Sequence, residues 1–295
     1  MAPPTPPTFE ASPRAELASV VVGDGLPVAV IGVINVSPES FHRGSVYRDE
    51  ALVRVAHEMV EAGAALIDVG GRSTAPYLET AIDEAEETAR LSRAVELLAA
   101  KLPVPVSADT PRPGPARAAL EAGARVINDV SALRDPDLAR LVASHSAGLI
   151  LMASPRPDRQ AGTGAPAPVA AIERLLAEGL GRAREAGIAE RRIVVDPGIG
   201  FFRDEAVPWH EWDARVLAGL AALRSLGRPV CVGVSRKSFI GAVLGCPDPA
   251  DRLSGSLAAT AIAVANGAAV VRTHDVAQTR DAVRVAERLR RAGAR

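Results

Sequence analysis

Residues 191–198, RRIVVDPG, show the pattern that decides the fold: a short apolar, β-branched run that ends in a polar, glycine-containing cluster. The pattern recurs along the chain, and a helical stretch follows most of its occurrences. Its eight occurrences are residues 28–35, 64–71, 105–110, 124–131, 148–154, 191–198, 229–235 and 268–275. Strands that alternate with helices predict a parallel sheet, and eight such units predict a closed (β/α)8 TIM barrel of the α/β class.

Length and composition predict one barrel domain. At 295 residues the chain has the size of a single α/β barrel, so we expect residues 27–295 to form it. Residues 1–26 are rich in proline and contain few large apolar side chains, which predicts a disordered lead-in. They lack the basic start and apolar centre of a secretory signal. No apolar run is long enough to span a bilayer, and we expect a cytoplasmic protein without membrane contact.

Charge and cysteine content exclude several classes of function. The formal net charge of −1 provides neither a basic surface for nucleic acid nor a polybasic surface for a membrane. Any phosphate binding must therefore be local. Cys231 falls in an expected strand and Cys246 in a loop, without the paired spacing of a metal site. We interpret them as a buried small side chain and a free thiol in a reducing compartment.

Polar side chains follow the expected strands at their carboxyl ends, where (β/α)8 barrels carry their chemistry. These candidates are Asn35, Asp109, Asn128, Asp196, Lys237, Arg272 and His274. Asn35 could hold a phosphate oxygen or a hydrated Mg²⁺. Arg272 and His274 are two residues apart in a strand and share a face, so together they could bind an anion.

Asp196 ends a largely apolar strand, where a buried carboxylate is costly unless a donor pairs with it. A 2-amino-4-oxo heterocycle offers such a donor, because its edge presents two parallel N–H groups. Asp109 and Asp129 are weaker candidates, since either could cap the next helix. The twin glycines Gly70 and Gly71 allow close approach of a ligand, and a turn with positive φ is the less favoured alternative.

Seven motifs at these strand ends resemble, in order, those of the dihydropteroate synthase family of pterin-binding enzymes. They are NVSPESF (35–41), DVGGRSTAP (68–76), SADT (107–110), IND (127–129), DPGIGF (196–201), VSRKSF (234–239) and RTHD (272–275). The resemblance covers roughly residues 27–290. It implies a transferase that joins a dihydropterin diphosphate to an aminobenzene acceptor and releases diphosphate.

The resemblance also implies roles for individual residues. The pterin pocket would be formed by Asp109, Asn128, Asp196 and Lys237. The diphosphate would be bound by Asn35, Arg272 and His274, with Mg²⁺ as cofactor near Asn35. Thr74, Pro76 and Ser238 would lie near the acceptor. Asn35, Lys237, Arg272 and His274 are the expected catalytic residues, and no protein nucleophile is required. Family members suggest a homodimer formed through barrel helices.

One strand-end loop departs from the family pattern. The family commonly reads GESTRP, whereas this chain has Arg72 before Ser-Thr and Ala75 after it. This departure slightly favours the methanopterin branch, whose acceptor is a ribofuranosylaminobenzene 5′-phosphate, over p-aminobenzoate. Arg72, His42 or Arg43 could pair with that phosphate. The alternative is an ion pair between Arg72 and Glu79 or another nearby acid.

Two other functions remain open. One is a methyltransferase that passes a methyl group from a pterin to a corrinoid, which would leave Arg272 and His274 without a diphosphate to bind. The other is a pterin-binding protein that has lost catalysis, which the altered loop would permit.

Overall fold

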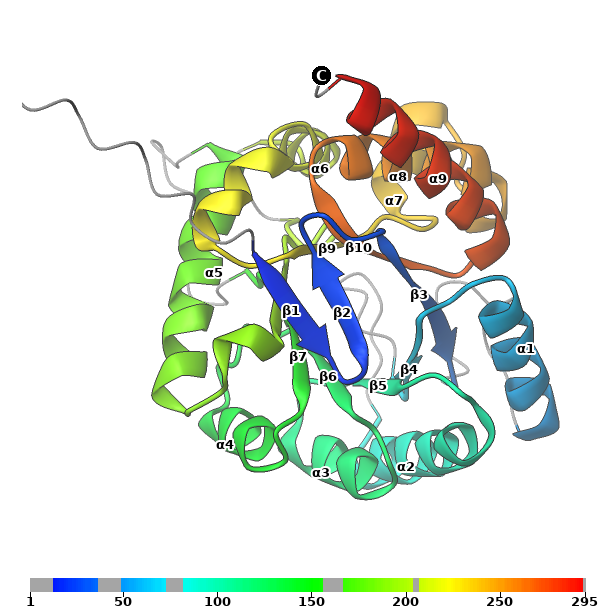
Figure 1. Ribbon diagram of the computed structural model, residues 1–295, viewed down its shortest axis with the longest axis vertical. Helices are drawn as coiled ribbons and strands as arrows, with labels where there is room; N and C mark the ends of the chain where they lie inside the picture. The colour runs from blue at the N-terminus through cyan, green and yellow to red at the C-terminus, as the bar shows by residue number, and fades with distance from the viewer. Residues whose placement is uncertain (1–12, 37–48, 73–81, 156–166, 204–206, 294–295) are drawn as a thin grey trace, which may run out of the picture.

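The computed structural model describes residues 13–36, 49–72, 82–155, 167–203 and 207–293 (Figure 1). The strands are β1 (Arg14–Leu17), β2 (Val20–Gly23), β3 (Ala29–Asn35), β4 (Leu66–Gly70), β5 (Val106–Asp109), β6 (Val126–Asp129), β7 (Gly148–Met152), β8 (Ile193–Asp196), β9 (Val230–Gly233) and β10 (Ala268–Thr273). The α-helices are α1 (Asp49–Glu61), α2 (Glu84–Lys101), α3 (Pro113–Glu121), α4 (Pro136–Ser144), α5 (Pro168–Glu185), α6 (Trp209–Ala218), α7 (Ser238–Leu244), α8 (Leu253–Ala265) and α9 (Val276–Gly293).

Eight parallel strands close into a barrel in the order β10-β3-β4-β5-β6-β7-β8-β9. This confirms the predicted (β/α)8 fold, and each strand falls within one of the eight runs identified in the sequence. Register between β8 and β9 is limited to the pair Val195 and Val230, whereas the other neighbours share three to five pairs. None of the described helices is long and apolar enough to cross a membrane.

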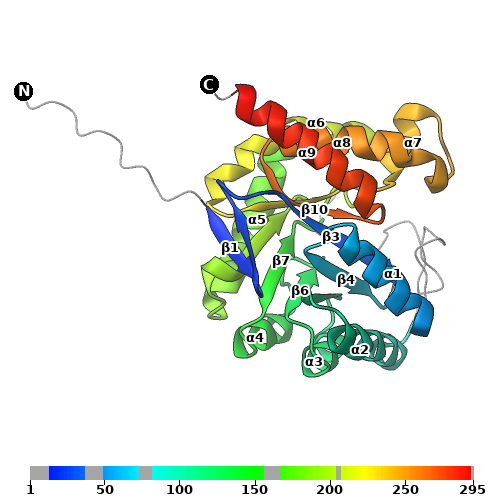
Figure 2. The same ribbon diagram turned by 45° about the vertical axis from the view of Figure 1, so that its right-hand side comes forward.

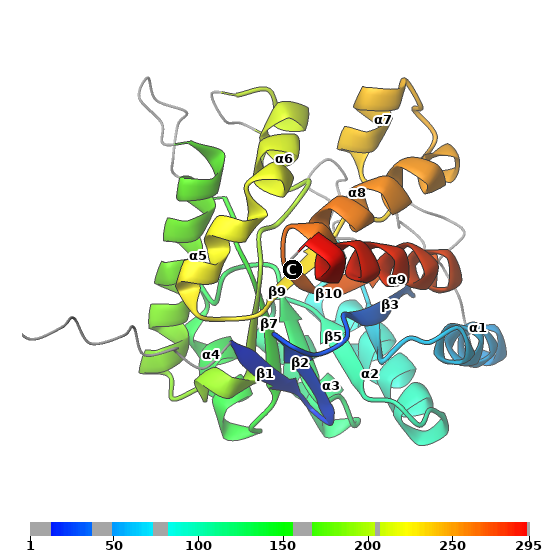
Figure 3. The same ribbon diagram turned by 45° about the horizontal axis from the view of Figure 1, so that its top comes forward.

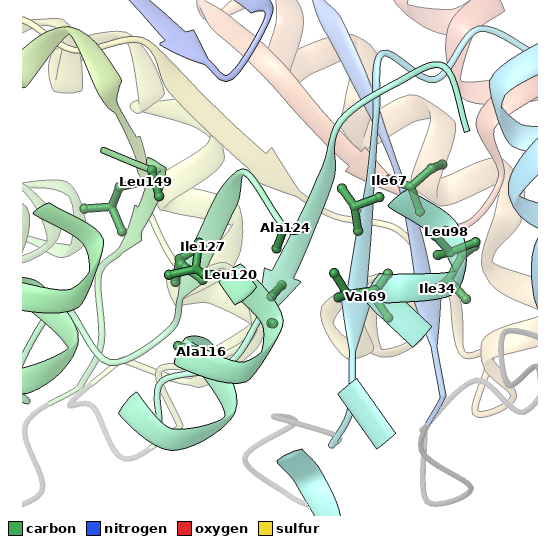
Figure 4. Close-up of a cluster of buried hydrophobic side chains, with 14 of the residues drawn as sticks. Ile34, Ile67, Val69, Leu98, Ala116, Leu120, Ala124, Ile127 and Leu149 are labelled. Carbon is green, nitrogen blue, oxygen red and sulfur yellow. The ribbon is translucent and has the colours of Figure 1, made fainter. Parts of the chain in front are cut away.

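The helices surround the strands and bury an apolar layer between the two. Figure 4 shows part of this layer, in which Ile67 and Val69 of β4 lie near Leu98 of α2. In the same layer Ile127 of β6 lies near Leu120 of α3 (Figure 4). In Figure 2 α1 is seen outside β3 and β4. Because alternate strand residues face opposite sides, the residues between these apolar ones point into the barrel.

Local signals in the sequence set several helix starts. Asp83 caps α2 by accepting a hydrogen bond from the Glu86 N–H at 2.7 Å. Asp135 caps α4 through the Asp137 N–H at 2.8 Å, and Pro136 occupies the first turn. A carboxylate at this position satisfies a backbone donor that the helix leaves unpaired, so each helix begins at a defined residue.

The antiparallel β1–β2 hairpin lies across the amino-terminal end of the barrel (Figure 1). Ala15, Leu17 and Val22 are at most 1% exposed and pack with the inward-facing apolar residues of the barrel strands. The prediction of a disordered lead-in over residues 1–26 is therefore wrong for residues 14–23. The two strands are formed by the short stretches AEL (15–17) and VVV (20–22), which follow the proline-rich start; residues 1–12 lie outside the described part.

Candidate active site

Arg272 of β10 lies at the centre of the carboxyl-terminal mouth of the barrel and contacts two carboxylates. Its Nε donates to Asp68 Oδ2 at 3.0 Å, and its Nη2 contacts the same oxygen. Nη2 also donates to Asp109 Oδ2 at 2.9 Å. Burial alone would lower the pKa of Arg272, but the two carboxylates outweigh it and raise that pKa. The guanidinium therefore remains charged and bridges β4, β5 and β10.

Asp68 is a site residue that the sequence analysis did not single out. Its side chain is fully buried, and Asn128 Nδ2 donates to its Oδ2 at 3.4 Å. The signal was present, because Asp68 lies two residues after the inward-facing Leu66 and must point into the barrel. A carboxylate inside an otherwise apolar strand needs a cation or donors, which here are Arg272 and Asn128.

Asp109 shares the Arg272 guanidinium and lies at the end of β5. Burial is the main cause that raises the pKa of Asp109, to about 7, and Arg272 opposes the rise while the nearby Asp68 adds to it. Asp109 can therefore gain or lose a proton near neutral pH while Arg272 stays charged.

Asp196 ends β8 and is 4% exposed. Its Oδ1 accepts the Gly198 N–H at 2.8 Å, and Cys231 of β9 forms a side-chain hydrogen bond with it. Burial raises the pKa of Asp196, while Gly198, Arg272 and Lys237 oppose the rise. Cys231 is fully buried, and both cysteines are free, as predicted.

Asn128 and Asp129 end β6 but face opposite sides. Asn128 points into the barrel toward Asp68. Asp129 accepts the backbone N–H groups of Ser131 at 2.8 Å and Leu133 at 2.5 Å. It thereby holds a turn in which Ala132 and Leu133 have φ of 61° and 52°. Asp129 therefore stabilises this turn, and the prediction that it could cap the next helix is wrong, because the N-cap of α4 is Asp135.

Lys237 follows β9 and lies against the loop after β8. Its Nζ is 4.7 Å from the centre of the Phe201 ring. A Cβ added at Gly200, where φ is +86°, would lie 3.1 Å from Lys237 Cδ and would crowd it. Burial is the main cause that lowers the pKa of Lys237, to about 8; Arg272 lowers it further, and Asp196, Asp213 and Asp109 raise it. Phe201 ends the DPGIGF motif, but its contact with Lys237 was not predicted from the sequence.

His274 and the segment after β9 are held together by two contacts between motifs. His274 Nδ1 and Ser235 Oγ are 3.0 Å apart. The Arg236 guanidinium makes a bidentate pair with Asp275, with N–O distances of 2.9 and 2.7 Å. Arg236 and Asp275 therefore have a structural role within VSRKSF and RTHD. Their ion pair fixes the backbone next to Lys237 in one segment and next to His274 in the other.

Arg72 points to a buried acid at the edge of the mouth. Its Nε lies 3.6 Å from Glu87 Oε2, and the Glu87 side chain is 1% exposed. Arg112 Nη1 binds the same oxygen at 3.0 Å, and Thr110 Oγ1 donates to Glu87 Oε1 at 2.6 Å. Arg72 therefore pairs with a nearby acid, as one of its two interpretations predicted, although this acid is the buried Glu87 of α2; pairing with an acceptor phosphate stays a prediction.

Ser238 begins α7 beside the loop after β8. Arg203 Nη2 donates to Ser238 Oγ at 2.5 Å, and the Arg203 guanidinium stacks 4.2 Å from the centre of the Trp209 ring. Arg203 was missed, although it follows DPGIGF at a strand end. The predicted acceptor residues Thr74 and Pro76, with His42, Arg43 and Ala75, lie outside the described residues.

Asn35 ends β3 next to Gly70 of β4. Its Oδ1 lies 2.9 Å from the position that a Gly70 Cβ would occupy, so the missing side chain makes room for the amide. No group of three or more His, Cys, Asp or Glu side chains able to hold a metal ion occurs in the part of the chain that the structure describes. The Asn35 amide oxygen is a hard donor of the kind that Mg²⁺ accepts, so this residue fits the expected magnesium site.

The family model for pterin binding enzymes matches residues 31–274, which defines the class of this barrel. Dihydropteroate synthase of Bacillus subtilis is 39% identical over 252 residues, covering 84% of each chain. That of Escherichia coli K12 is 36% identical over 263 residues, covering 88% of this chain and 90% of the other. A Xanthomonas albilineans dihydropteroate synthase structure with 4-aminobenzoic acid is 37% identical, with a TM-score of 0.81 over 95% of this chain and 98% of the other.

A Coxiella burnetii dihydropteroate synthase structure with pteroic acid is 34% identical, with a TM-score of 0.80 over 95% of this chain and 99% of the other. The chain belongs to the dihydropteroate synthase family of pterin-binding enzymes, as its motifs predicted.

Proposed function

We propose that this transferase joins 6-hydroxymethyl-7,8-dihydropterin diphosphate to p-aminobenzoate in folate biosynthesis. The carbon–oxygen bond to diphosphate breaks, a carbon–nitrogen bond to the aromatic amine forms, and the amine loses a proton. The observation that carries the proposal is the polar inner ring at the barrel mouth, where Arg272 joins Asp68 and Asp109 beside Asp196 and Lys237. The pterin can stabilise the cationic methylene, so the chain needs to supply binding and charge rather than a nucleophile.

The pterin is assigned to the deepest polar residues. The Asp196 carboxylate would accept the two parallel N–H groups of the pterin edge through its two oxygens, and the Gly198 N–H, which donates to Oδ1, orients it. Asn128 and Asp109, on neighbouring strands, would bind the remaining ring atoms. Lys237 would donate to the pterin from the opposite side of the mouth, where Arg272 and Asp196 influence its pKa.

The leaving diphosphate is assigned to Asn35, His274 and Arg272. Charged and N–H donors near the developing phosphate charge lower the barrier to departure. Arg272 also binds Asp109, so it connects the pterin and diphosphate subsites. When bound, Mg²⁺ would neutralise part of the diphosphate charge. Asn35 Oδ1 would be its protein ligand, and substrate oxygens would supply others.

The acceptor is assigned to the outer part of the mouth near Ser238, Phe201 and Lys237, with Thr74 and Pro76. Two observations favour p-aminobenzoate over its ribosylated phosphate. A solved relative carries 4-aminobenzoic acid, and Arg72, the expected phosphate ligand, has its Nε 3.6 Å from the buried Glu87 carboxylate. The methanopterin acceptor therefore has weaker support than the sequence alone gave it.

A diphosphate-release assay with one dihydropterin donor and each of the two acceptors tests this function. We expect turnover with p-aminobenzoate and little with the ribofuranosyl phosphate. Preference for the phosphorylated acceptor, lost in Arg72→Ala, would assign the chain to the methanopterin branch. Binding of pterin without diphosphate release would identify a non-catalytic homologue, and methyl transfer to a corrinoid would identify a methyltransferase.

We also propose a homodimer formed through α7, α8 and α9, which lie beside one another (Figure 3). Large apolar side chains on these helices are exposed: Val243, Leu244, Ile262, Val285 and Leu289 are 49–69% exposed. A second copy of the chain would cover this surface. In sedimentation analysis Ile262→Glu should give a monomer, whereas Val21→Glu, at a 51% exposed site on β2, should leave the dimer intact.

A further inference from the structure

Asp213 of α6 is a buried carboxylate outside the ring of strand-end residues. It is 1% exposed, and its Oδ1 accepts the Gly200 N–H at 2.9 Å. Its Oδ2 is buried and has no hydrogen-bond partner among the described residues. A buried carboxylate with one unsatisfied oxygen is costly, and a small apolar residue would avoid that cost. The position therefore calls for an explanation beyond packing.

The loop that Asp213 holds is the surface against which Lys237 lies. Gly198 and Gly200 have φ of +72° and +86°, so two residues of the loop between Asp196 and Phe201 adopt the left-handed backbone conformation. Lys237 fits over the missing side chain of Gly200, with Cδ at 3.1 Å and Nζ at 3.5 Å from the position of a Cβ. By fixing the Gly200 N–H, Asp213 fixes where the Lys237 side chain can lie.

The charges around Asp213 are mostly cationic. The groups that face it are Lys237 after β9, Arg203 of the same loop and His210 of α6. Burial raises the pKa of Asp213 to about 6, and the Gly200 N–H and these three groups oppose the rise. Asp213 is therefore ionised above about pH 6. Its negative charge acts on Lys237, whose pKa burial would otherwise lower further.

We propose that Asp213 is a positioning residue for Lys237: its hydrogen bond to Gly200 places the lysine, and its charge keeps the lysine protonated. Only the expected effect on catalysis rests on the proposed function. The effect on Lys237 itself can be measured without turnover.

The sequence permits a direct measurement. The chain has only two lysines, Lys237 and the exposed Lys101 of α2, so selective ¹³C or ¹⁵N labelling of lysine gives two side-chain signals. Lys101 serves as an internal reference. Asp213→Asn keeps an oxygen that can accept the Gly200 N–H but removes the charge, whereas Asp213→Ala removes both. Glu211→Gln, at an exposed position of the same helix, is the matched control.

In Asp213→Asn the titration midpoint of Lys237 should fall by about one unit, while Lys101 does not move. At pH 8 such a shift lowers the charged fraction of Lys237 from about one half to about one tenth, so kcat/KM should fall about five-fold. Asp213→Ala should show the same shift together with a higher KM for the acceptor. Glu211→Gln should leave the midpoint and KM unchanged.

An unchanged Lys237 midpoint in a folded Asp213→Asn protein would overturn the proposal and leave Asp213 with a structural role alone. A shifted midpoint in a protein that does not use dihydropterin diphosphate would uphold the effect on Lys237 and reject the proposed function. The two failures are therefore distinguishable.

Discussion

The two ends of the barrel interior are built from the same strands but have opposite chemistry. At the amino-terminal end, Leu66 of β4, Val194 of β8 and Val270 of β10 pack with the β1–β2 hairpin in an apolar layer. Two residues further along the same strands, at the same inward face, stand Asp68, Asp196 and Arg272. That step is only about 6.6 Å along a strand.

The difference separates stability from binding. The apolar layer contributes by burial and close packing, which favour the folded state. The charged layer is expensive to bury and is retained at the end where ligands bind. We call the apolar layer at the amino-terminal end the lower layer, and the charged layer at the mouth the upper layer. Substitutions in the lower layer should change the free energy of unfolding alone. Most substitutions in the upper layer should change ligand binding alone.

Arg272→Ala should have the largest effect and is the exception to this rule. It leaves the Asp68 and Asp109 carboxylates buried without their cation, which should lower the free energy of unfolding by about 3–5 kcal/mol. Urea unfolding measures this loss. Adding Asp68→Asn should restore part of it, because one stranded charge is removed. Since Arg272 binds Asp109, use of pterin and of diphosphate should both suffer; a stable Arg272→Ala protein would contradict the central role of this guanidinium.

Leu17→Ala tests the lower layer. Leu17 is 1% exposed in the hairpin, and truncating a buried leucine costs about 2–5 kcal/mol. We expect a lower urea midpoint with an unchanged affinity for pterin in calorimetric titration. Val21→Ala, at a 51% exposed position of the same hairpin, should change neither quantity appreciably. A weaker pterin affinity in Leu17→Ala would show that the two layers are coupled.

Asp196→Asn tests the upper layer. Exchanging a carboxylate acceptor for an amide donor should weaken pterin binding by about 2–4 kcal/mol. The fold should persist, because Asn can still accept the Gly198 N–H and a buried charge is removed. Isothermal titration of the folded variant provides the measurement, and unchanged affinity would remove Asp196 from the pterin subsite.

The last prediction concerns Asp109 and pH. Because the pKa of Asp109 is raised from 3.8 to about 7 in the folded protein, the folded state binds more protons than the unfolded state between those values. The contribution of Asp109 to stability should therefore decrease as pH rises from about 4 to 7, by at most about 1.4 kcal/mol per pH unit for one proton. Asp109→Asn should flatten this slope in urea unfolding at several pH values, and an equal slope would contradict the raised pKa.

Much of the fold could be predicted, because a barrel strand buried on both faces has a distinct apolar run and a polar end. The same rule located Asn128, Asp196 and Arg272. It missed Asp68, since that residue lies inside its run rather than after it. The strand-end rule also missed Asp213 and Glu87, because these residues lie in helices and no sequence pattern indicates that the helices reach the mouth. The hairpin was missed because its short strands follow a proline-rich start.

The amino-terminal hairpin has a kinetic consequence. Ala15, Leu17 and Val22 of the hairpin close the amino-terminal end of the barrel, so among the described residues the proposed pterin pocket opens toward the polar mouth. A pterin bound at Asp196 would then be covered by an acceptor in the outer subsite proposed near Ser238. Substrates should therefore enter in a fixed order, with the pterin before the aromatic amine, and an acceptor that arrives first should block the donor.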